Sequence, residues 1–496
     1  IQIFKDGAGL RLFRESVEVF KQLPASVIHH FDSSRVPLGD VQHRGAVAFA
    51  TPSISPALIG VGYIIGFELA AINFSGGVLA WLVFIPLAFF LDPNLAANLS
   101  VGGVAPAEGE LIFSVWYNIV RPVAVGAMLV GAANTMWGMR ASIAKAFSGA
   151  FKRSHKDDSK SRLERDLDSR GVLLGIVGLT IPMTWIYWNF THNLVGAVVA
   201  AVVMLVLGFL LSAVGGYLVG LVGGSNQPVS GLTLSALILA ALLMVAFGVT
   251  GLAGVGAVLG VSAVVCCAIC VSGSLIQDLK VGHILGGTPK KMEIAEIIAT
   301  ITTAFVLVFP MLWLHQANIK QGGIGIGDRA LSAPQAGLMA QLAQGIVGGE
   351  MPWGLILFGM CFSLALILMK APSPTLIAVG MYLPFETTGA IFVGGCIKWL
   401  ADRLAVRRGI AGESFDSFGS LVASGLIAGE SLTGVMMAGI VLLSSTFKSF
   451  TYSLFGVEQF AWVSGPAGAW ASLVALGAIV WVLVKIPLDN AKPNAA

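Results

Sequence analysis

The chain has 496 residues, of which 56% are hydrophobic and only 11% are charged. A soluble domain carries about 25% charged residues, so this composition excludes a soluble globular protein and predicts an all-α polytopic membrane protein. The formal net charge of +3 carries little information by itself. The sequence contains no Gly-rich phosphate loop, zinc-protease motif or nucleic-acid-binding motif. We therefore expect no cofactor, no resident metal and no nucleic-acid partner.

Residues 1–45 mix charged and apolar side chains, and they predict an interfacial or cytoplasmic amphipathic segment in helical form. The chain starts at Ile1 without an initiator Met, so we expect an upstream part of the gene product to precede it. Apolar runs that are long enough to span a bilayer follow along the chain. They lie at 76–91, 117–138, 171–191, 194–222, 232–250, 253–276, 293–314, 352–370, 416–444 and 463–486.

One apolar, glycine-rich stretch occurs twice. Residues 55–82 read SPALIGVGYIIGFELAAINFSGGVLAWL, and residues 373–400 read SPTLIAVGMYLPFETTGAIFVGGCIKWL, with thirteen identities in twenty-eight ungapped positions. Each copy begins Ser-Pro and contains a break before a glutamate. Backbone that is not helical is tolerated at membrane depth only beside protein or a water-filled cavity. The two copies add the candidate membrane segments 52–74 and 373–397. Both are candidates for re-entrant hairpins or broken helices that line a pathway, and ordinary spanning helices are the alternative.

Basic residues predict which loops face the cytoplasm. The segments 140–170, 279–292 and 398–412 are rich in Lys and Arg and should be cytoplasmic. The segment 92–116 contains acidic residues but no Lys or Arg, so it should lie outside. If every apolar segment crossed the membrane, 398–412 would lie outside. All three basic segments lie on the cytoplasmic side if both repeat segments enter the membrane and return to the side from which they entered.

These observations predict a duplicated transmembrane helix bundle with broken or re-entrant helices. Internal duplication is the usual build of secondary transporters, whose solute site lies near the membrane midplane between the halves. The chain then divides into an amphipathic segment (1–45), a first repeat core (46–139), a cytoplasmic basic linker (140–170), central transmembrane helices (171–370), a second repeat core (371–486) and a C-terminal tail (487–496).

Three glutamates are candidates for a proton or solute pathway, because an ionisable residue at membrane depth usually faces a cavity. Glu68 and Glu386 occupy equivalent points of the two copies. Burial should raise the pKa of each carboxyl group, which could then carry a coupling proton or hold a solute ammonium group. The alternative is a hydrogen bond that holds the bend. Glu430 lies within an apolar helix among small residues, and its alternative role is an interhelical hydrogen bond.

Two further stretches supply polar groups. Arg121 lies near the outer mouth of its helix, where its side chain either reaches the interface or holds a solute carboxylate. The sequence GGSNQPVSGLT ends one apolar run and opens the next. Its Asn226, Gln227 and Ser230 could line the pathway or bind peptide groups, and a plain turn between helices is the alternative.

Several stretches together resemble the oligopeptide transporter family, which includes the yellow stripe-like metal-chelate transporters. They are SPALIGVGYIIG, GGVLAWLVFIPL, GGSNQPVSGLT, QDLKVGHILGGTPKK, LSAPQAGLMAQLAQGIVGG, AVGMYLPFETT and GLIAGESLTGV, and they extend over about residues 50–445 in the family's order. The bacterial branch is the most similar, since the signatures of the eukaryotic peptide transporters are absent. Tyr382 and Gln335 lie in these stretches and join the candidate pathway residues.

The resemblance implies proton-coupled uptake of small peptides, peptide derivatives or metal chelates. We therefore expect a secondary active symporter and not an enzyme, placed as a multi-pass protein in a bacterial inner membrane. Its partners would be a peptide-like or chelate solute, protons and the lipid bilayer. Export or exchange of modified peptides, a membrane-embedded enzyme and a passive channel are the alternatives. The oligomeric state stays open, with a homodimer among the options.

Overall fold

Each apolar run of the sequence forms a helix, because a helix satisfies its backbone polar groups within one segment, as a lipid environment requires. In the computed structural model, nine helical runs of the described residues are long and apolar enough to span a membrane. This confirms the predicted all-α polytopic membrane fold. Apart from shorter gaps, the structure describes residues 10–92, 95, 108–144, 162–222, 227, 229–328, 331, 333–349, 352–410, 412–443, 453, 460–464 and 466–490.

The chain folds into two units, which we call unit 1 and unit 2. Unit 1 comprises residues 1–131, 310–332 and 354–496, and unit 2 comprises residues 132–309 and 333–353. The helices α6 (Arg121–Gly138) and α12 (Pro289–Lys320) run from one unit into the other. The remaining helical elements of unit 1 are α2 (Pro56–Val78), η1 (Leu79–Phe84), α3 (Ile85–Leu91), α5 (Glu108–Val115), η2 (Trp116–Val120), α14 (Trp353–Leu368), α15 (Pro374–Tyr382), α16 (Phe385–Arg407), α17 (Glu413–Leu443), η5 (Ala461–Ser464) and α19 (Pro466–Asn490).

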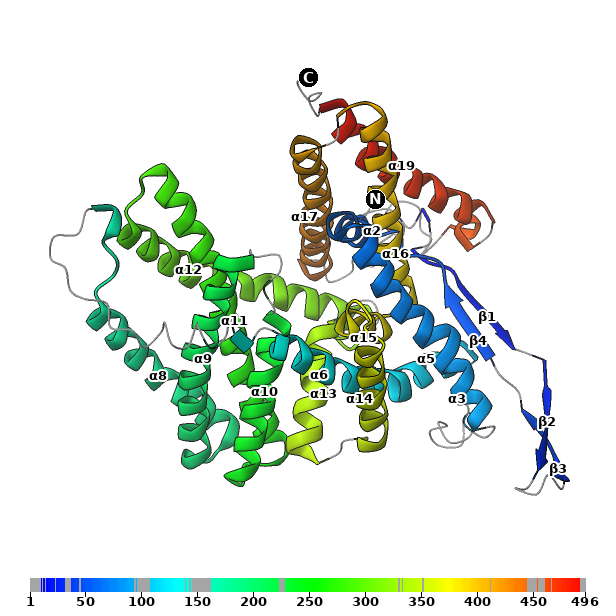
Figure 1. Cartoon of the computed structure of the whole chain (residues 1–496), viewed down its shortest axis with the longest axis horizontal. Helices are drawn as coiled ribbons and strands as arrows, with labels where there is room; N and C mark the ends of the chain where they lie inside the picture. The colour runs from blue at the N-terminus through cyan, green and yellow to red at the C-terminus, as the bar shows by residue number, and fades with distance from the viewer. Residues whose placement is uncertain are drawn as a thin grey trace. The chain divides into compact units, whose positions relative to one another are not determined.

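The N-terminal segment forms strands, so the helix predicted within residues 1–45 is wrong for the part that the structure describes. Strand β1 (Glu18–Gln22) pairs antiparallel with β4 (Ala46–Ala50), and β2 (Ser26–Phe31) pairs antiparallel with β3 (Pro37–His43) (Figure 1). The registers run from Glu18 opposite Ala50 to Gln22 opposite Ala46, and from Ser26 opposite His43 to His30 opposite Gly39.

Both repeat segments are broken helices. In the first, α2 is interrupted at Gly66, whose φ of 82° and ψ of 171° lie outside the helical region, and a positive φ favours glycine. In the second, α15 ends at Tyr382 and α16 begins at Phe385, with Leu383 and Pro384 extended between them. Gly66 and Pro384 are 318 residues apart, as are the two copies of the sequence.

The chain does not turn back after the first repeat segment. The predicted segments 52–74 and 76–91 form one helical run, Pro56–Leu91, in which α2, η1 and α3 follow each other directly. The prediction that they are two separate membrane segments is therefore wrong. Each copy forms a helix that is interrupted and then continues, and neither copy forms a hairpin that turns back. The sidedness of the loops stays a prediction.

The two broken helices pack against each other through reciprocal contacts. The α-carbon of Gly62 lies so close to the carbonyl of Ile391 that a Cβ atom would collide with it. The equivalent residue Gly380 lies against the carbonyl of Asn73 in the same way. Aromatic rings repeat this reciprocity. The ring centroids lie 5.9 Å apart in the pair Phe67–Phe392 and 5.5 Å apart in the pair Phe74–Phe385. Phe74 and Phe392 occupy the same position in the two copies, and their rings stack at 4.8 Å.

The core of unit 1 joins the broken helices to the C-terminal part of the chain. Ile59 and Tyr63 of α2 are almost fully buried, together with Phe415 of α17 and Ile479 and Leu483 of α19. Helices α16 and α17 both pack on α19, and α17 packs on α2. The broken helices are therefore held by a common apolar cluster.

Unit 2 is a helix bundle around α11 (Gly251–Leu285). This helix packs against α8 (Ser169–Thr191), α9 (Leu194–Val222), α10 (Val229–Ala246) and α13 (Pro334–Gly348). The short helix η3 (Arg162–Glu164) precedes α8. The sequence did not predict α13 as a membrane segment, and with 15 residues it is shorter than a usual span.

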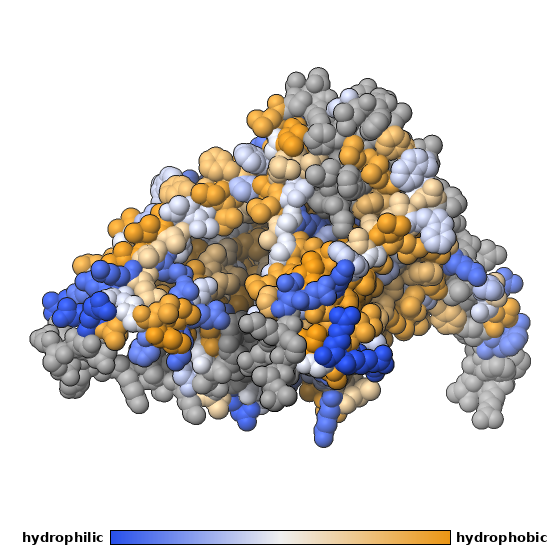
Figure 2. Space-filling view, turned by 90° about the horizontal axis from the view of Figure 1, so that it is seen from above, coloured by the Kyte–Doolittle hydropathy of each residue, from blue (hydrophilic) through white to orange (hydrophobic). Residues whose placement is uncertain are grey.

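The surface is apolar where lipid is expected. On α8 the side chains of Leu173, Leu174 and Ile181 are 62%, 73% and 72% exposed. A soluble protein rarely exposes contiguous apolar surface of this kind. Hydrophobic residues cover much of the face shown in Figure 2, as expected for a multi-pass integral membrane protein.

Candidate functional site

Arg121 is placed by an irregular stretch of helix. The π-helical turn η2 leads directly into α6, which begins at Arg121 and continues with Pro122. Short π-helical segments inside α-helices are frequent at functional sites. The Arg121 side chain points into the protein, because the residue is only 9% exposed.

Aromatic rings surround the Arg121 guanidinium group. Its carbon Cζ lies 4.2 Å from the ring centroid of Tyr382, 4.6 Å from that of Tyr117 and 5.2 Å from that of Trp116. Its Nη2 donates a hydrogen bond to the Tyr382 hydroxyl. The structure therefore brings together two residues that the sequence named separately, Arg121 and Tyr382.

Residues of both broken helices contact Trp116, one of the rings beside Arg121. Trp81 of η1 lies 5.6 Å from Trp116 and 6.5 Å from Phe385, measured between ring centroids. The Trp116 Nε1–H donates to the carbonyl of Met381 at 3.2 Å. These contacts place the site at the break between α15 and α16. We call the set the aromatic box; it consists of Arg121, Trp81, Trp116, Tyr117, Tyr382 and Phe385.

A mostly apolar cavity of about 370 Å³ is lined by residues that neighbour members of the aromatic box in sequence, and also by Asp92. Ile119, Val120 and Val123 line it from the helical turns on either side of Arg121, and Phe84 lines it one turn after Trp81. This cavity can accept an apolar group of one or two side chains in size.

Glu430 forms a second polar site in unit 1, at the start of α2. Its carboxylate accepts hydrogen bonds from the Ser55 hydroxyl at 2.9 Å and from the Ala57 backbone N–H at 2.7 Å. Pro56 occupies the first position of this helix. The contact ties α17 to the first turn of α2. This is an interhelical hydrogen bond, as one of the two sequence interpretations expected, and a pathway role for Glu430 stays a prediction.

The repeated glutamates lie in different surroundings. Glu68 is exposed and Glu386 is half-buried, so the protein itself does not bury Glu68 as the sequence predicted. Glu386 stands in the first turn of α16. Its backbone carbonyl accepts a hydrogen bond from the Ser53 N–H at 3.0 Å, and the start of α2 therefore lies beside the break in the second repeat.

The polar loop before α10 belongs to unit 2, and Asn226 lies outside the described residues. The Gln227 side chain donates from Nε2 to the Ile269 carbonyl of α11 at 3.0 Å. It also packs against Gly215 and Gly273, where a Cβ atom would collide with it. Gln227 therefore fastens the loop between α9 and α11. Ser230 and Gln335 are exposed residues of the same unit.

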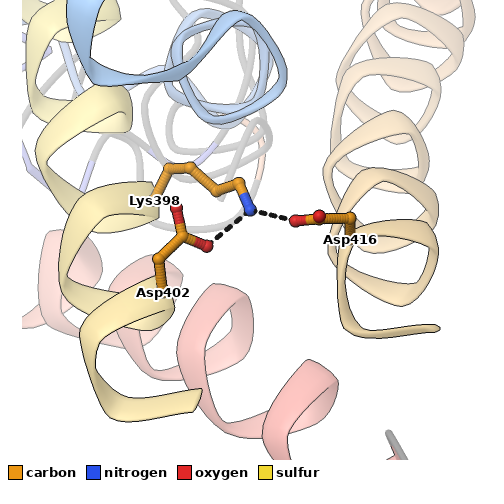
Figure 3. A network of polar contacts seen from close by, with 3 residues as sticks. All are labelled: Lys398, Asp402 and Asp416. Carbon is orange, nitrogen blue, oxygen red and sulfur yellow. Dashed lines mark hydrogen bonds and ion pairs between the residues drawn. The ribbon is translucent and has the colours of Figure 1, made fainter. Parts of the chain in front are cut away.

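A charge network that the sequence did not single out joins α16 to α17. The Lys398 ammonium group lies 2.6 Å from Asp402 and 2.5 Å from Asp416 (Figure 3). The Lys398–Asp402 spacing of four residues predicts a contact on one helix face and could have revealed half of the network. The contact with Asp416 depends on packing between helices, which no local pattern shows. The ammonium group also lies 5.6 Å from the Tyr63 ring.

Comparison with known proteins identifies the family of the chain. The family described as OPT oligopeptide transporter protein matches residues 46–441, a range that includes both broken helices, the aromatic box and Glu430. A protein of Haemophilus influenzae named "Putative oligopeptide transporter" is 29% identical over 439 residues, which cover 81% of this chain and 68% of that protein. The chain therefore belongs to the oligopeptide transporter family.

Proposed function

We propose that the protein is a proton-coupled symporter that takes up small peptides, peptide derivatives or metal chelates across a bacterial inner membrane. Family membership supports transport of a peptide-like solute. Broken helices in an apolar bundle are typical of solute and coupling-ion sites in secondary transporters. The proton coupling rests on the carboxylates of unit 1, above all on Glu430.

The observation that carries the proposal is the contact between Glu430 and the first turn of α2. Ser55 and Ala57 donate hydrogen bonds to this carboxylate, and such bonds are stronger when the acceptor is charged. Protonation of Glu430 removes this charge and weakens the link between α17 and α2. Proton binding would thereby be coupled to a movement of one helix against a broken helix.

The reciprocal contacts of the two broken helices support a duplicated organisation. Gly62 and Gly380 approach equivalent carbonyl groups of the opposite copy, and thirteen identities link the two sequences. We infer that the copies form one pseudo-symmetric pair. In this arrangement Glu68 and Glu386 are equivalent groups beside the two breaks, and they remain further candidates for carrying a proton.

Substitution of Glu430 tests the proposal. The protein is reconstituted in liposomes, and uptake of labelled trialanine, reduced glutathione and ferric citrate is measured with an imposed pH gradient. We expect Glu430→Gln to lower proton-driven accumulation by about tenfold or more, since a hydrogen bond to a charged group contributes roughly 1.5–3 kcal/mol. Exchange between equal pools of solute should persist, because it needs no net proton transfer.

A matched control is Glu293→Gln, because Glu293 also accepts a backbone N–H, that of Leu167 at 2.8 Å, but lies in unit 2. This variant should accumulate solute at the wild-type rate. The double variant Glu68→Gln/Glu386→Gln should lose accumulation and retain exchange. Wild-type proton-driven uptake by the Glu430→Gln variant would contradict the assigned role of Glu430.

A further inference from the structure

The aromatic box contains a buried positive charge for which the described residues provide no carboxylate. Arg121 is 9% exposed, and its contacts are a hydroxyl group and three aromatic ring faces. Its Nε–H is fully buried and has no hydrogen-bond partner among the described residues. A buried charge without a counter-charge is costly, and cation–π contacts offset this cost in part only.

A second buried donor in the box also lacks an acceptor. The indole Nε1 of Trp81 has no hydrogen-bond partner among the described residues, although a buried tryptophan N–H usually finds one. Trp81 packs against Trp116, whose ring lies under the Arg121 guanidinium group. The box thus combines one positive charge with two buried N–H groups that are free to donate.

The chemistry of these groups selects a monoanion with two acceptor oxygens. The guanidinium carbon lies over the rings of Tyr117 and Tyr382, so a ligand must reach the group from a side that these rings leave open. Arginine presents a planar fork of N–H groups that matches a carboxylate in a bidentate geometry. One positive charge balances one carboxylate, whereas a phosphate dianion would need more donors than the box supplies.

We propose that the aromatic box binds the carboxylate group of the solute, and that the protein therefore selects solutes with a free carboxylate over their amides. This inference rests on the proposed function for the statement that the ligand is transported. The carboxylate can come from the C-terminus of a peptide or from a polycarboxylate metal chelate.

Ligand pairs that differ only in the carboxylate test the inference. Binding of trialanine, trialanine amide and ferric citrate to the purified full chain is measured by isothermal titration calorimetry. We expect the wild type to bind trialanine about tenfold or more tightly than its amide. In Arg121→Lys the ratio of acid to amide affinity should fall several-fold but stay above one, because an ammonium group keeps the positive charge and lacks the planar fork.

Two further variants separate recognition from folding. Tyr382→Phe keeps the ring but removes the hydroxyl that fixes the guanidinium group, so the ratio should fall by a smaller factor with little change in melting temperature. Arg140→Lys is the matched control, because Arg140 also lies over a tryptophan ring, that of Trp137 at 5.2 Å, but is exposed. Its ratio should equal that of the wild type.

The outcomes distinguish this inference from the proposed function. Equal wild-type affinity for trialanine and its amide, or an equal loss of both in Arg121→Lys, would overturn the carboxylate site. Binding of neither trialanine nor ferric citrate to the wild type would overturn both proposals. Selective carboxylate binding without proton-driven uptake would support the site and overturn the proton coupling. Preference for ferric citrate over trialanine would identify the chelate as the source of the carboxylate.

Discussion

At the scale of single residues, Lys398 links helices α16 and α17 through its contacts with two aspartates. It lies at the start of the segment predicted to be cytoplasmic, and its side chain is 17% exposed. Burial alone would lower the pKa of Lys398, but the hydrogen bonds and charges of Asp402 and Asp416 outweigh burial and raise it. The two aspartates therefore stabilise the charged ammonium group between α16 and α17.

A double-mutant cycle tests this link. Lys398→Met and Asp416→Asn should each lower the melting temperature, and the double variant should be destabilised by less than the sum of the two single variants. We expect a coupling energy of about 1 kcal/mol, because Asp416 is partly exposed. A lysine whose pKa is raised by folding adds to the free energy of unfolding. This contribution is complete below the ordinary lysine pKa of about 10.4 and is lost as the pH rises through the raised pKa. The contribution of Lys398 to the coupling should thus stay constant from about pH 7 to about pH 9.

The control variant is Asp402→Asn, which leaves the contact between α16 and α17 intact. It should change the melting temperature less than Asp416→Asn does. Strictly additive effects of Lys398→Met and Asp416→Asn would show that the network does not couple the two helices.

The sequence indicated single residues of the site better than their pairing. Arg121 and Tyr382 were both candidates, because a charged residue and a motif aromatic stand out in an apolar chain. Their hydrogen bond joins positions 261 residues apart, and no local spacing predicts such a contact. Trp81, Trp116 and Tyr117 were not named, because aromatic residues are common near membrane interfaces and do not by themselves indicate a site.

At the scale of elements, the packing of the two broken helices depends on glycines without side chains. Gly62 and Gly380 each face a backbone carbonyl of the other helix, where a Cβ atom would collide. A backbone atom cannot move aside as the end of a flexible side chain can. A methyl group at either position must therefore push α2 and α16, or α2 and α15, apart.

Substitution of these glycines should destabilise the protein. We expect Gly62→Ala and Gly380→Ala each to lower the melting temperature, at a cost of about 1–3 kcal/mol as for other overpacked sites, and to reduce uptake. The control is Gly175→Ala on α8, where nothing lies within 4 Å of an added Cβ atom and alanine favours the helix. Equal melting temperatures for Gly62→Ala and Gly175→Ala would contradict the close packing.

The predicted elements follow the apolar runs closely but fail at the N-terminus. The run 171–191 became α8 and 194–222 became α9, because length and hydropathy determine a spanning helix. The strands β1 and β2 were missed, although Val19, Val27 and Ile28 are β-branched residues that favour extended structure. Pairing of β1 with β4 spans a long stretch of sequence, which a local amphipathic pattern cannot reveal.

At the scale of the whole molecule, unit 1 contains both broken helices and the groups to which we assign function. Arg121, Tyr382 and Glu430 all lie in unit 1, whereas Gln227 and Ser230 lie in unit 2. The duplicated sequence predicted a break in each copy, because both copies retain a helix-breaking residue before the glutamate, but it did not predict that the two copies pack against each other. It could not predict that the carboxylate of Glu430 and the guanidinium group of Arg121 occupy separate sites, at the start of α2 and beside the break of the second repeat.

The most direct test of the account is solute accumulation by the wild-type protein in liposomes with an imposed pH gradient. A proton-coupled symporter should concentrate trialanine or ferric citrate inside acid-outside vesicles beyond the external concentration. A protonophore should abolish this accumulation, because it removes the gradient that drives it. Equilibration of the solute without accumulation, unaffected by the gradient, would contradict proton coupling and indicate a passive channel.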